Sequence, residues 1–141
     1  MTTITVEGID KLNARLAKIN AQIAGKQGGT MEKAMRRSVY RVVATLADYP
    51  RQRAGSGYVR TGTLGRRWTS KVKVTTEGDG IIGRAGNNTI YGPWVQSEAF
   101  QTAFHRQTGW VTDRDALDRN RAAIERDLGQ AVRLIVESSG P

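Results

Sequence analysis

The sequence contains no cysteine among its 141 residues. This absence excludes disulfides, thiolate metal sites and cysteine nucleophiles together. No apolar run approaches the ~18 residues that cross a bilayer as a helix. The polar start, MTTITVEGID, lacks the apolar centre of a signal peptide. We therefore expect a soluble protein that is made in a cytoplasm and has no membrane partner.

Acidic residues are missing from one long stretch of the chain. Between Asp48 and Glu77 there are seven Lys or Arg residues and no Asp or Glu, whereas the net charge of the whole chain is +9. Within this stretch, GSGYVRTGTLGRRWTSK (residues 55–71) combines four glycines and four cations with two aromatic residues. Such a basic segment predicts attraction to polyanions, either nucleic acid or the acidic face of another protein.

Hydrophobic periodicity predicts two helices near the start of the chain. Apolar residues recur at spacings of three and four, which is typical of an amphipathic helix: Ile9, Leu12, Leu16, Ile19 and Ile23. The glycine-rich segment GKQGG (residues 25–29) ends this helix. A second helix is predicted from an N-cap at Thr30 to about Asp48, because Pro50 disfavours helical angles in the residue before it.

A final amphipathic helix is predicted near the end of the chain. Thr112 is a suitable N-cap, and Asp115 three residues later forms a variant of the capping box. We interpret Asp113, Asp115 and Asp118 as residues that favour the helix dipole, not as metal ligands. The apolar face of this helix comprises Leu117, Ile124, Leu128, Ala131, Val132 and Ile135. Residues 138–141 are expected to form a tail.

The middle of the chain predicts a loop followed by a small sheet. Residues 49–64 form a long, flexible loop or arm. Alternation over residues 68–75 predicts a strand that pairs with residues 81–85 across a turn at Glu77–Gly80. Residues 89–95 are a candidate third strand at an edge, because they include Pro93. Phe100 and Phe104 suggest one or two helical turns. The fold class is therefore α+β, in one domain over residues 1–141.

The sequence carries no complete motif for chemistry. The segment from Gly57 to Gly62 has the glycine spacing of a phosphate-binding loop, but Thr63 and Leu64 follow in place of Lys and Ser or Thr. The dinucleotide pattern fails because Arg60 stands where the third glycine belongs. His105 is the only histidine and has no recognisable nucleophile motif beside it. No His, Asp or Glu cluster has metal-ligand spacing, so we expect neither a cofactor nor a metal.

Three interpretations of the basic stretch follow from the residues themselves. Arginines with Tyr58 and Trp68 resemble a nucleic-acid surface, where cations meet phosphates and rings stack on bases. A run of charge is also typical of a solvated loop. Arg, Tyr and Trp are enriched at the centres of protein interfaces, and Trp94 and Trp110 fall in segments that read as loops. This last observation favours protein docking.

Four segments in the same order resemble the neck, or tail-completion, proteins of long-tailed bacteriophages: GIDKLNARLAKI, YVRTGTLGRRW, IYGPWVQSEAFQTAFHRQTGW and the closing amphipathic helix. The resemblance covers nearly the whole chain. It implies a structural virion protein and not an enzyme. Such proteins sit at the head–tail junction as rings around the DNA channel, and rings of six or twelve subunits fit the family. The implied partners are further copies of this chain and head-closure, tail-terminator or tail-tube proteins, with assembly in the host cytoplasm.

The resemblance also gives the basic stretch a purpose, as an arm that docks on a neighbouring subunit or ring. The candidate interface residues in this stretch are Arg51, Arg53, Tyr58, Arg60, Arg66, Arg67 and Trp68. A second set, which fits core packing and interface equally, comprises Tyr91, Trp94, Gln96, His105 and Trp110. We expect the arm to be poorly ordered in isolation and to order on assembly. The alternatives are a small basic nucleic-acid-binding protein that uses residues 49–76, and a hydrolase or nuclease-type toxin with His105 as its base.

Overall fold

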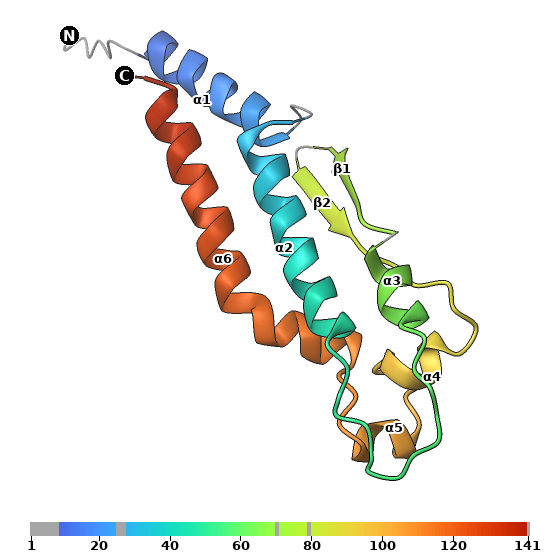
Figure 1. The fold of residues 1–141 in the computed structure, drawn as a ribbon. Helices are drawn as coiled ribbons and strands as arrows, with labels where there is room; N and C mark the ends of the chain where they lie inside the picture. Colours follow the sequence, from blue (N-terminus) through green and yellow to red (C-terminus); the bar gives the residue numbers. More distant parts are fainter. Residues whose placement is uncertain (1–8, 25–27, 70, 79, 141) are drawn as a thin grey trace, which may run out of the picture.

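The computed structural model describes residues 9–24, 28–69, 71–78 and 80–140 (Figure 1). Over these ranges the fold is α+β, as predicted, with helices and one two-stranded antiparallel sheet. The elements are α1 (Ile9–Ala24), α2 (Thr30–Ala47), α3 (Thr63–Thr69), β1 (Lys73–Glu77), β2 (Gly80–Arg84), α4 (Gly92–Gln96), α5 (Ala103–Gln107) and α6 (Asp113–Ser138). The predicted joint at residues 25–29 lies partly outside the described residues, as does Pro141 of the predicted tail.

An antiparallel pair, α2 and α6, forms the body of the molecule, and α1 lies against both helices at one end (Figure 1). The core between α2 and α6 includes Val43, Leu46 and Ile135, which are almost fully buried. Burial of one such side chain stabilises the fold by roughly 1.5–3 kcal/mol. An ion pair joins the same two helices: Arg41 Nη2 lies 2.8 Å from Asp127 Oδ2. The predicted helices therefore exist and pack by their apolar faces.

The helix starts agree with the sequence in one case and differ in another. At α6, the Thr112 hydroxyl accepts a bond from the Asp115 N–H at 3.1 Å, and the Asp115 carboxylate accepts one from the Thr112 N–H, so the capping box is confirmed. At α2, the N-cap is Gly29 and not Thr30, which lies inside the helix. The Glu32 carboxylate accepts the N–H of Gly28 instead. This bond ties the segment before the helix to its first turn, and no side chain caps α2 among the described residues.

The prediction of a strand over residues 68–75 is wrong for its first half. Residues 63–69 form α3, and the strand β1 begins at Lys73. The competing signal is a helical one, because Leu64 and Trp68 are four residues apart and share one face of α3. Close packing on α2 also favours the helix, since a Cβ added at Gly65 would lie 3.3 Å from the Ala47 Cβ.

The predicted hairpin is confirmed, with Glu77 paired to Gly80 across its turn. Gly78 has a φ of 59°, which suits the tight turns that join two antiparallel strands. The hairpin lies against α2 at Gly83, where an added Cβ would stand 2.4 Å from Val39 Cγ2. Only a residue without a side chain therefore lets the strand approach the helix so closely.

The third strand, predicted over residues 89–95, is wrong. Residues 92–96 form the short helix α4, with Pro93 in its first turn. Proline is favoured there because its φ is already helical and its missing N–H is not needed. The predicted turns near Phe104 are found as α5, which Thr102 caps. The predicted tail is also shorter, because α6 continues to Ser138 and Ser139 is its C-cap.

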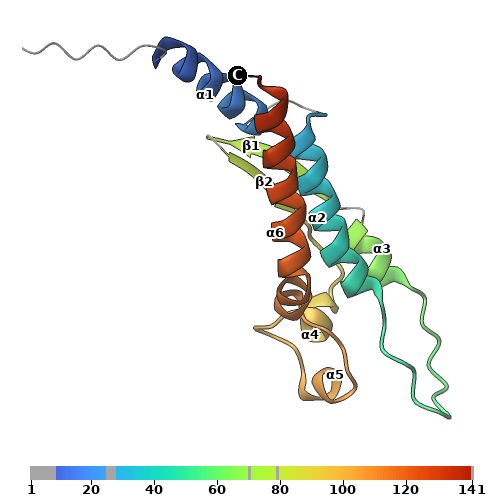
Figure 2. The same ribbon diagram turned by 90° about the vertical axis from the view of Figure 1, so that its left-hand side faces the viewer.

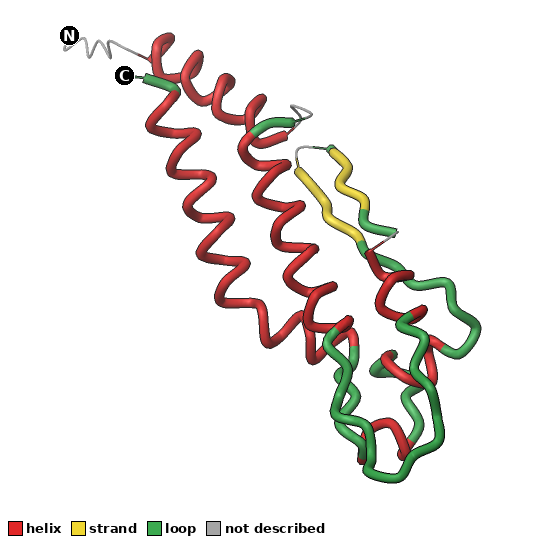
Figure 3. The backbone as a smooth tube through the Cα atoms, in the orientation of Figure 1, coloured by secondary structure: helices red, strands yellow, loops and turns green. Residues whose placement is uncertain are grey.

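Loop 48–62 and the helices α3, α4 and α5 form a lobe at the end of the body opposite α1 (Figures 1 and 3). In Figure 2 the loop between α2 and α3 extends away from the other parts of this lobe. None of the helices in the described ranges combines the length and apolar character needed to cross a bilayer. The part of the basic stretch from Tyr49 to Thr69 thus lies in the lobe, whereas β1 lies beside α2 (Figure 1).

Candidate functional site

A cavity of about 510 Å³ opens in the lobe, where loop 48–62 faces α4 and α5. We call it the loop cleft. No Asp or Glu is among its lining residues, which are Tyr49, Arg51, Gln52, Arg53, Ser56, Tyr58, Arg60, Thr61, Gly62, Thr63, Leu64, Tyr91, Val95, Phe104, His105, Thr108 and Trp110. Apolar and aromatic walls with a few convergent polar groups are typical of a binding site.

Arg60 lies at the centre of an aromatic cluster in the cleft. Its Cζ is 5.2 Å from the centroid of the Trp110 ring and 5.9 Å from that of the Tyr49 ring. The two rings lie 5.0 Å apart at 47° to each other. Arg60 also donates a hydrogen bond to the carbonyl of Pro50. Ring contacts with a cation are favourable, so these contacts hold the guanidinium in one place.

Tyr49 holds this cluster to the body. It follows Asp48, the C-cap of α2, and its hydroxyl accepts the N–H of Gly65 in α3 at 2.7 Å. On the other side of the cleft, buried Gln101 donates from its amide to the carbonyls of Val95 and Trp110, at 2.8 Å each. Hydrogen bonds therefore hold the walls of the cleft to α3, to α4 and to the segment before α6.

His105 forms part of the same wall. Its ring meets that of Trp110 edge to face, with centroids 6.1 Å apart. Its Nδ1 lies 2.7 Å from the Thr102 hydroxyl, which also accepts the backbone N–H of His105 as the cap of α5. No carboxylate of the described residues bonds to the imidazole. His105 therefore lies in the wall of the cleft, and its ring bonds to the Thr102 hydroxyl that caps α5.

The arginines of the cleft are among those that form no ion pair within the described residues. Within the described residues, ion pairs involve Arg36, Arg41, Arg84, Arg114, Arg121 and Arg126. Arg51, Arg53 and Arg60 have no ion pair with any carboxylate in these ranges. An arginine fork that meets no carboxylate within its own chain remains available to an anion from outside.

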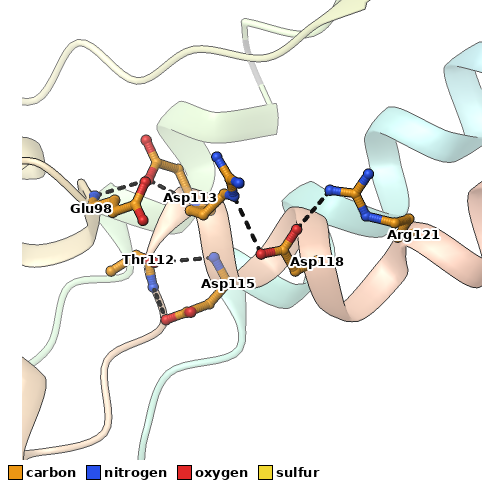
Figure 4. A network of polar contacts seen from close by, with 7 residues as sticks. Glu98, Thr112, Asp113, Asp115, Asp118 and Arg121 are labelled. Atoms are coloured by element: carbon orange, nitrogen blue, oxygen red, sulfur yellow. Dashed lines mark hydrogen bonds and ion pairs between the residues drawn. The ribbon is translucent and has the colours of Figure 1, made fainter.

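The acidic residues at the start of α6 form hydrogen bonds and ion pairs within the fold (Figure 4). Asp113 Oδ1 accepts the N–H of Glu98 at 2.9 Å, and Asp115 completes the capping box. Asp118 lies between Arg121 at 2.8 Å and Arg114 at 3.3 Å. The hydrogen bond from Arg121, with help from Arg114, lowers the pKa of Asp118. Among the described residues no group of His, Asp and Glu is arranged to hold a metal ion.

The cleft gathers seven of the predicted interface residues: Arg51, Arg53, Tyr58, Arg60, Tyr91, His105 and Trp110. The other five lie outside it. Arg66, Arg67 and Trp68 belong to α3 and not to the arm. Trp94 is exposed on α4. Gln96 is buried, so its amide acts inside the fold and not at a surface.

Gln96 and Trp68 form a polar pair beneath the cleft. The Trp68 indole N–H donates to Gln96 Oε1 at 2.8 Å, and Gln96 Nε2 donates to the carbonyl of Leu46 at 2.6 Å. The residue four positions after Leu46 is Pro50, which has no N–H to offer. Gln96 therefore satisfies a carbonyl that the end of α2 leaves without a backbone donor.

Sequence reasoning did not identify Tyr49, Leu64, Phe104 or Gln101 as parts of the site. Tyr49 had one signal, because an aromatic residue directly before a helix-ending proline is well placed to turn back on the body. Phe104 had been noted only for its helical spacing from Phe100. The positions of Leu64 and Gln101 depend on contacts between distant segments, which periodicity does not reveal.

Comparisons with protein-family models, with curated proteins and with solved structures give no match to this chain.

Proposed function

We propose that this protein is a structural component of a tailed-bacteriophage neck. Copies of the chain would form a ring around the DNA channel and join the tail to the head. The ordered sequence resemblance to neck proteins is the starting point. The loop cleft, which is lined with arginines and aromatic residues and lacks carboxylates, is compatible with docking on a neighbouring protein.

Exposed apolar side chains at both ends of the molecule carry the proposal. On α1, the apolar residues from Ile9 to Ile23 form one face, which we call the seam. Two of them, Leu12 and Leu16, are 54% and 48% exposed. In the lobe, Tyr58 is 69% exposed and Phe104 is 59% exposed. Leu12 and Leu16 are one turn apart on α1, and Tyr58 and Phe104 line the same cleft; exposed apolar side chains that lie together point to interaction surfaces. The exposed pair on α1 is the proposed contact between copies in a closed ring, and the lobe at the other end is the proposed contact with a neighbouring virion protein (Figure 1).

The seam on α1 gives a direct test by light scattering after size exclusion. The intact chain is expected to form a closed oligomer, and Leu16→Lys is expected to release smaller species, because a charge in an apolar contact is costly. Asn13→Lys adds the same charge at an exposed polar position of the same helix and should leave the oligomer intact. A monomer at every concentration, unchanged by Leu16→Lys, would contradict the proposal.

A second candidate function is nucleic-acid binding through the basic stretch. Arg51 and Arg53 are exposed, have no ion pair among the described residues and lie on the same loop as exposed Tyr58. Contacts with phosphates release counterions, so the affinity of such a protein falls steeply with salt. Arginines within a protein interface predict a milder dependence. DNA affinity at two salt concentrations separates these candidates.

A further inference from the structure

We propose that the loop cleft binds an acidic segment of a second protein, with a carboxylate on Arg60 and a neighbouring apolar side chain against Tyr91 and Phe104. The inference rests on the proposed function, because it names the chemistry of the neighbouring virion protein that the lobe would meet. It concerns the lobe alone and is separate from the ring contact through α1.

Arg60 lines the cleft, and its guanidinium is only partly used by the fold. An arginine side chain has five N–H donors, and the described residues provide one acceptor for them, the Pro50 carbonyl. The rings of Tyr49 and Trp110 lie against the guanidinium and restrict its movement. A planar carboxylate matches the remaining fork of donors and can accept two parallel bonds. Because Arg60 is already held in place, binding costs little further loss of side-chain entropy.

The rest of the cleft suits an apolar side chain beside that carboxylate. Leu64 and Val95 are buried in its wall, whereas Tyr91 and Phe104 are exposed at its edge. The cavity of about 510 Å³ is large enough for a few side chains of an extended segment. Arg51 and Arg53 lie on the exposed loop of the same cleft and would attract further acidic residues.

A second copy of this chain is a poor source of that acidic segment. The chain carries a net charge of +9. Within the described residues, many of its carboxylates already bind its own arginines, namely Glu32, Glu77, Asp118 and Asp127. Asp113 and Asp115 bond to backbone N–H groups at the start of α6. Charge complementarity therefore points to a different, acidic protein.

A nucleic-acid strand fits the centre of the cleft less well. Strands bind to a groove that combines a row of cations with free ring faces on which bases stack. Here the rings of Tyr49 and Trp110 already contact each other and Arg60. Arg60 is the half-buried arginine of the cleft, whereas Arg51 and Arg53 lie on the exposed loop. The observations therefore favour the peptide carboxylate.

The test is a selection from an mRNA-displayed library of random peptides on the full-length chain, followed by affinity measurements on the selected peptides. We expect them to be rich in Asp or Glu next to aromatic or aliphatic residues. Arg60→Gln should weaken their binding at least about tenfold, because a charge-assisted bidentate contact is lost. Arg60→Lys should give an intermediate loss. Arg133→Gln, at an exposed position of α6, is the matched control and should change nothing.

Phe104→Ser tests the cleft while Arg60, Tyr49 and Trp110 stay in place, although it removes the contact of Phe104 with His105. It should also weaken binding, with folding verified by circular dichroism. The inference is overturned if the selected peptides are not acidic, if no peptide is selected, or if their affinity is independent of Arg60 and Phe104. It is also overturned if a single-stranded oligonucleotide binds more tightly through Arg60. Oligomer size on the same samples separates the proposals: a ring without acidic-peptide binding rejects only the cleft, and peptide binding without a ring rejects only the neck function.

Discussion

Arg60 lies over the indole ring of Trp110, with 5.2 Å between its Cζ and the ring centroid. The two residues are fifty positions apart in the sequence, so their contact ties loop 48–62 to the segment before α6. The loop has few backbone bonds of its own, among them the one from the Ser56 N–H to the Arg53 carbonyl at 3.2 Å. Side-chain contacts are therefore the main restraint on its position.

Replacement of Trp110 should loosen this loop. Trp110→Leu removes the contacts of the indole with Arg60, Tyr49 and His105. We expect a loss of about 1–2 kcal/mol in the free energy of unfolding, from one aromatic pair and one cation contact, together with faster amide exchange in residues 51–61. Trp94→Leu is the control, because Trp94 is exposed on α4; it should cost under about 0.5 kcal/mol. Equal effects of the two changes would show that the cluster adds nothing.

Gln96→Leu should destabilise the fold although it places an apolar residue in the core. The change leaves the Trp68 indole N–H and the Leu46 carbonyl without partners. Each unsatisfied buried group costs about 1–3 kcal/mol. Urea denaturation of this variant, compared with Gln130→Leu at an exposed position of α6, measures the effect. A Gln96→Leu variant as stable as the parent would contradict the bridging role.

Alanine substitutions at two glycines should change the free energy of unfolding in opposite directions. Gly83→Ala puts a methyl group 2.4 Å from Val39 Cγ2 and should cost about 1–3 kcal/mol. Gly129→Ala lies within α6 with open space around it, so it should stabilise by about 0.5–1 kcal/mol. Thermal unfolding of both variants checks the prediction. Tolerance of Gly83→Ala would contradict the packing of β2 on α2, and destabilisation by Gly129→Ala would contradict the open surroundings of that position in α6.

The ion pair between Arg41 and Asp127 should make stability depend on pH at the acid end. The hydrogen bond from Arg41 lowers the pKa of Asp127 in the folded state. The unfolded state, with a pKa of about 3.9, then binds more protons than the folded state at low pH. The stabilisation is therefore present above that value and is lost as pH falls through the folded-state pKa.

Asp127→Asn measures this effect. The variant should be less stable than the parent at neutral pH, and the difference should shrink below about pH 4 and at high salt, because screening weakens the ion pair. Glu137→Gln removes a charge that has no ion pair among the described residues, so it serves as the control. If Asp127→Asn is less stable than the parent by the same amount from neutral pH to strong acid, the charge of Asp127 is not what stabilises the fold.

The long elements could be predicted from the sequence because their signals are local. The seam from Ile9 to Ile23, the apolar face of α6 and the capping box at Thr112 each depend on neighbours within one or two turns. The hairpin between β1 and β2 follows likewise from the turn at Glu77–Gly80. Leu117 is expected on the apolar face of α6 but is exposed, because its neighbour Ala116 is the buried residue there and Asn120 bonds to Thr45 of α2.

The middle of the chain could not be predicted, because distant contacts decide its structure. The first residues of the expected strand form α3 instead, because Gly65 packs against Ala47 and the Trp68 side chain hydrogen-bonds to Gln96. The expected third strand becomes α4 once Pro93 starts a helical turn. The loop cleft combines residues from before α3, from α4 and α5 and from the approach to α6, so the basic arm could be foreseen but not its aromatic partners. The expectation that the arm orders only on assembly stays a prediction.

Native mass spectrometry of the purified full chain, with and without a short DNA duplex at low and high salt, tests the central claim most directly. The neck proposal predicts a closed oligomer of six or twelve copies whose mass the duplex leaves unchanged at both salt concentrations. A monomer or dimer that takes up the duplex at low salt and releases it at high salt would contradict the proposal and support a nucleic-acid-binding protein.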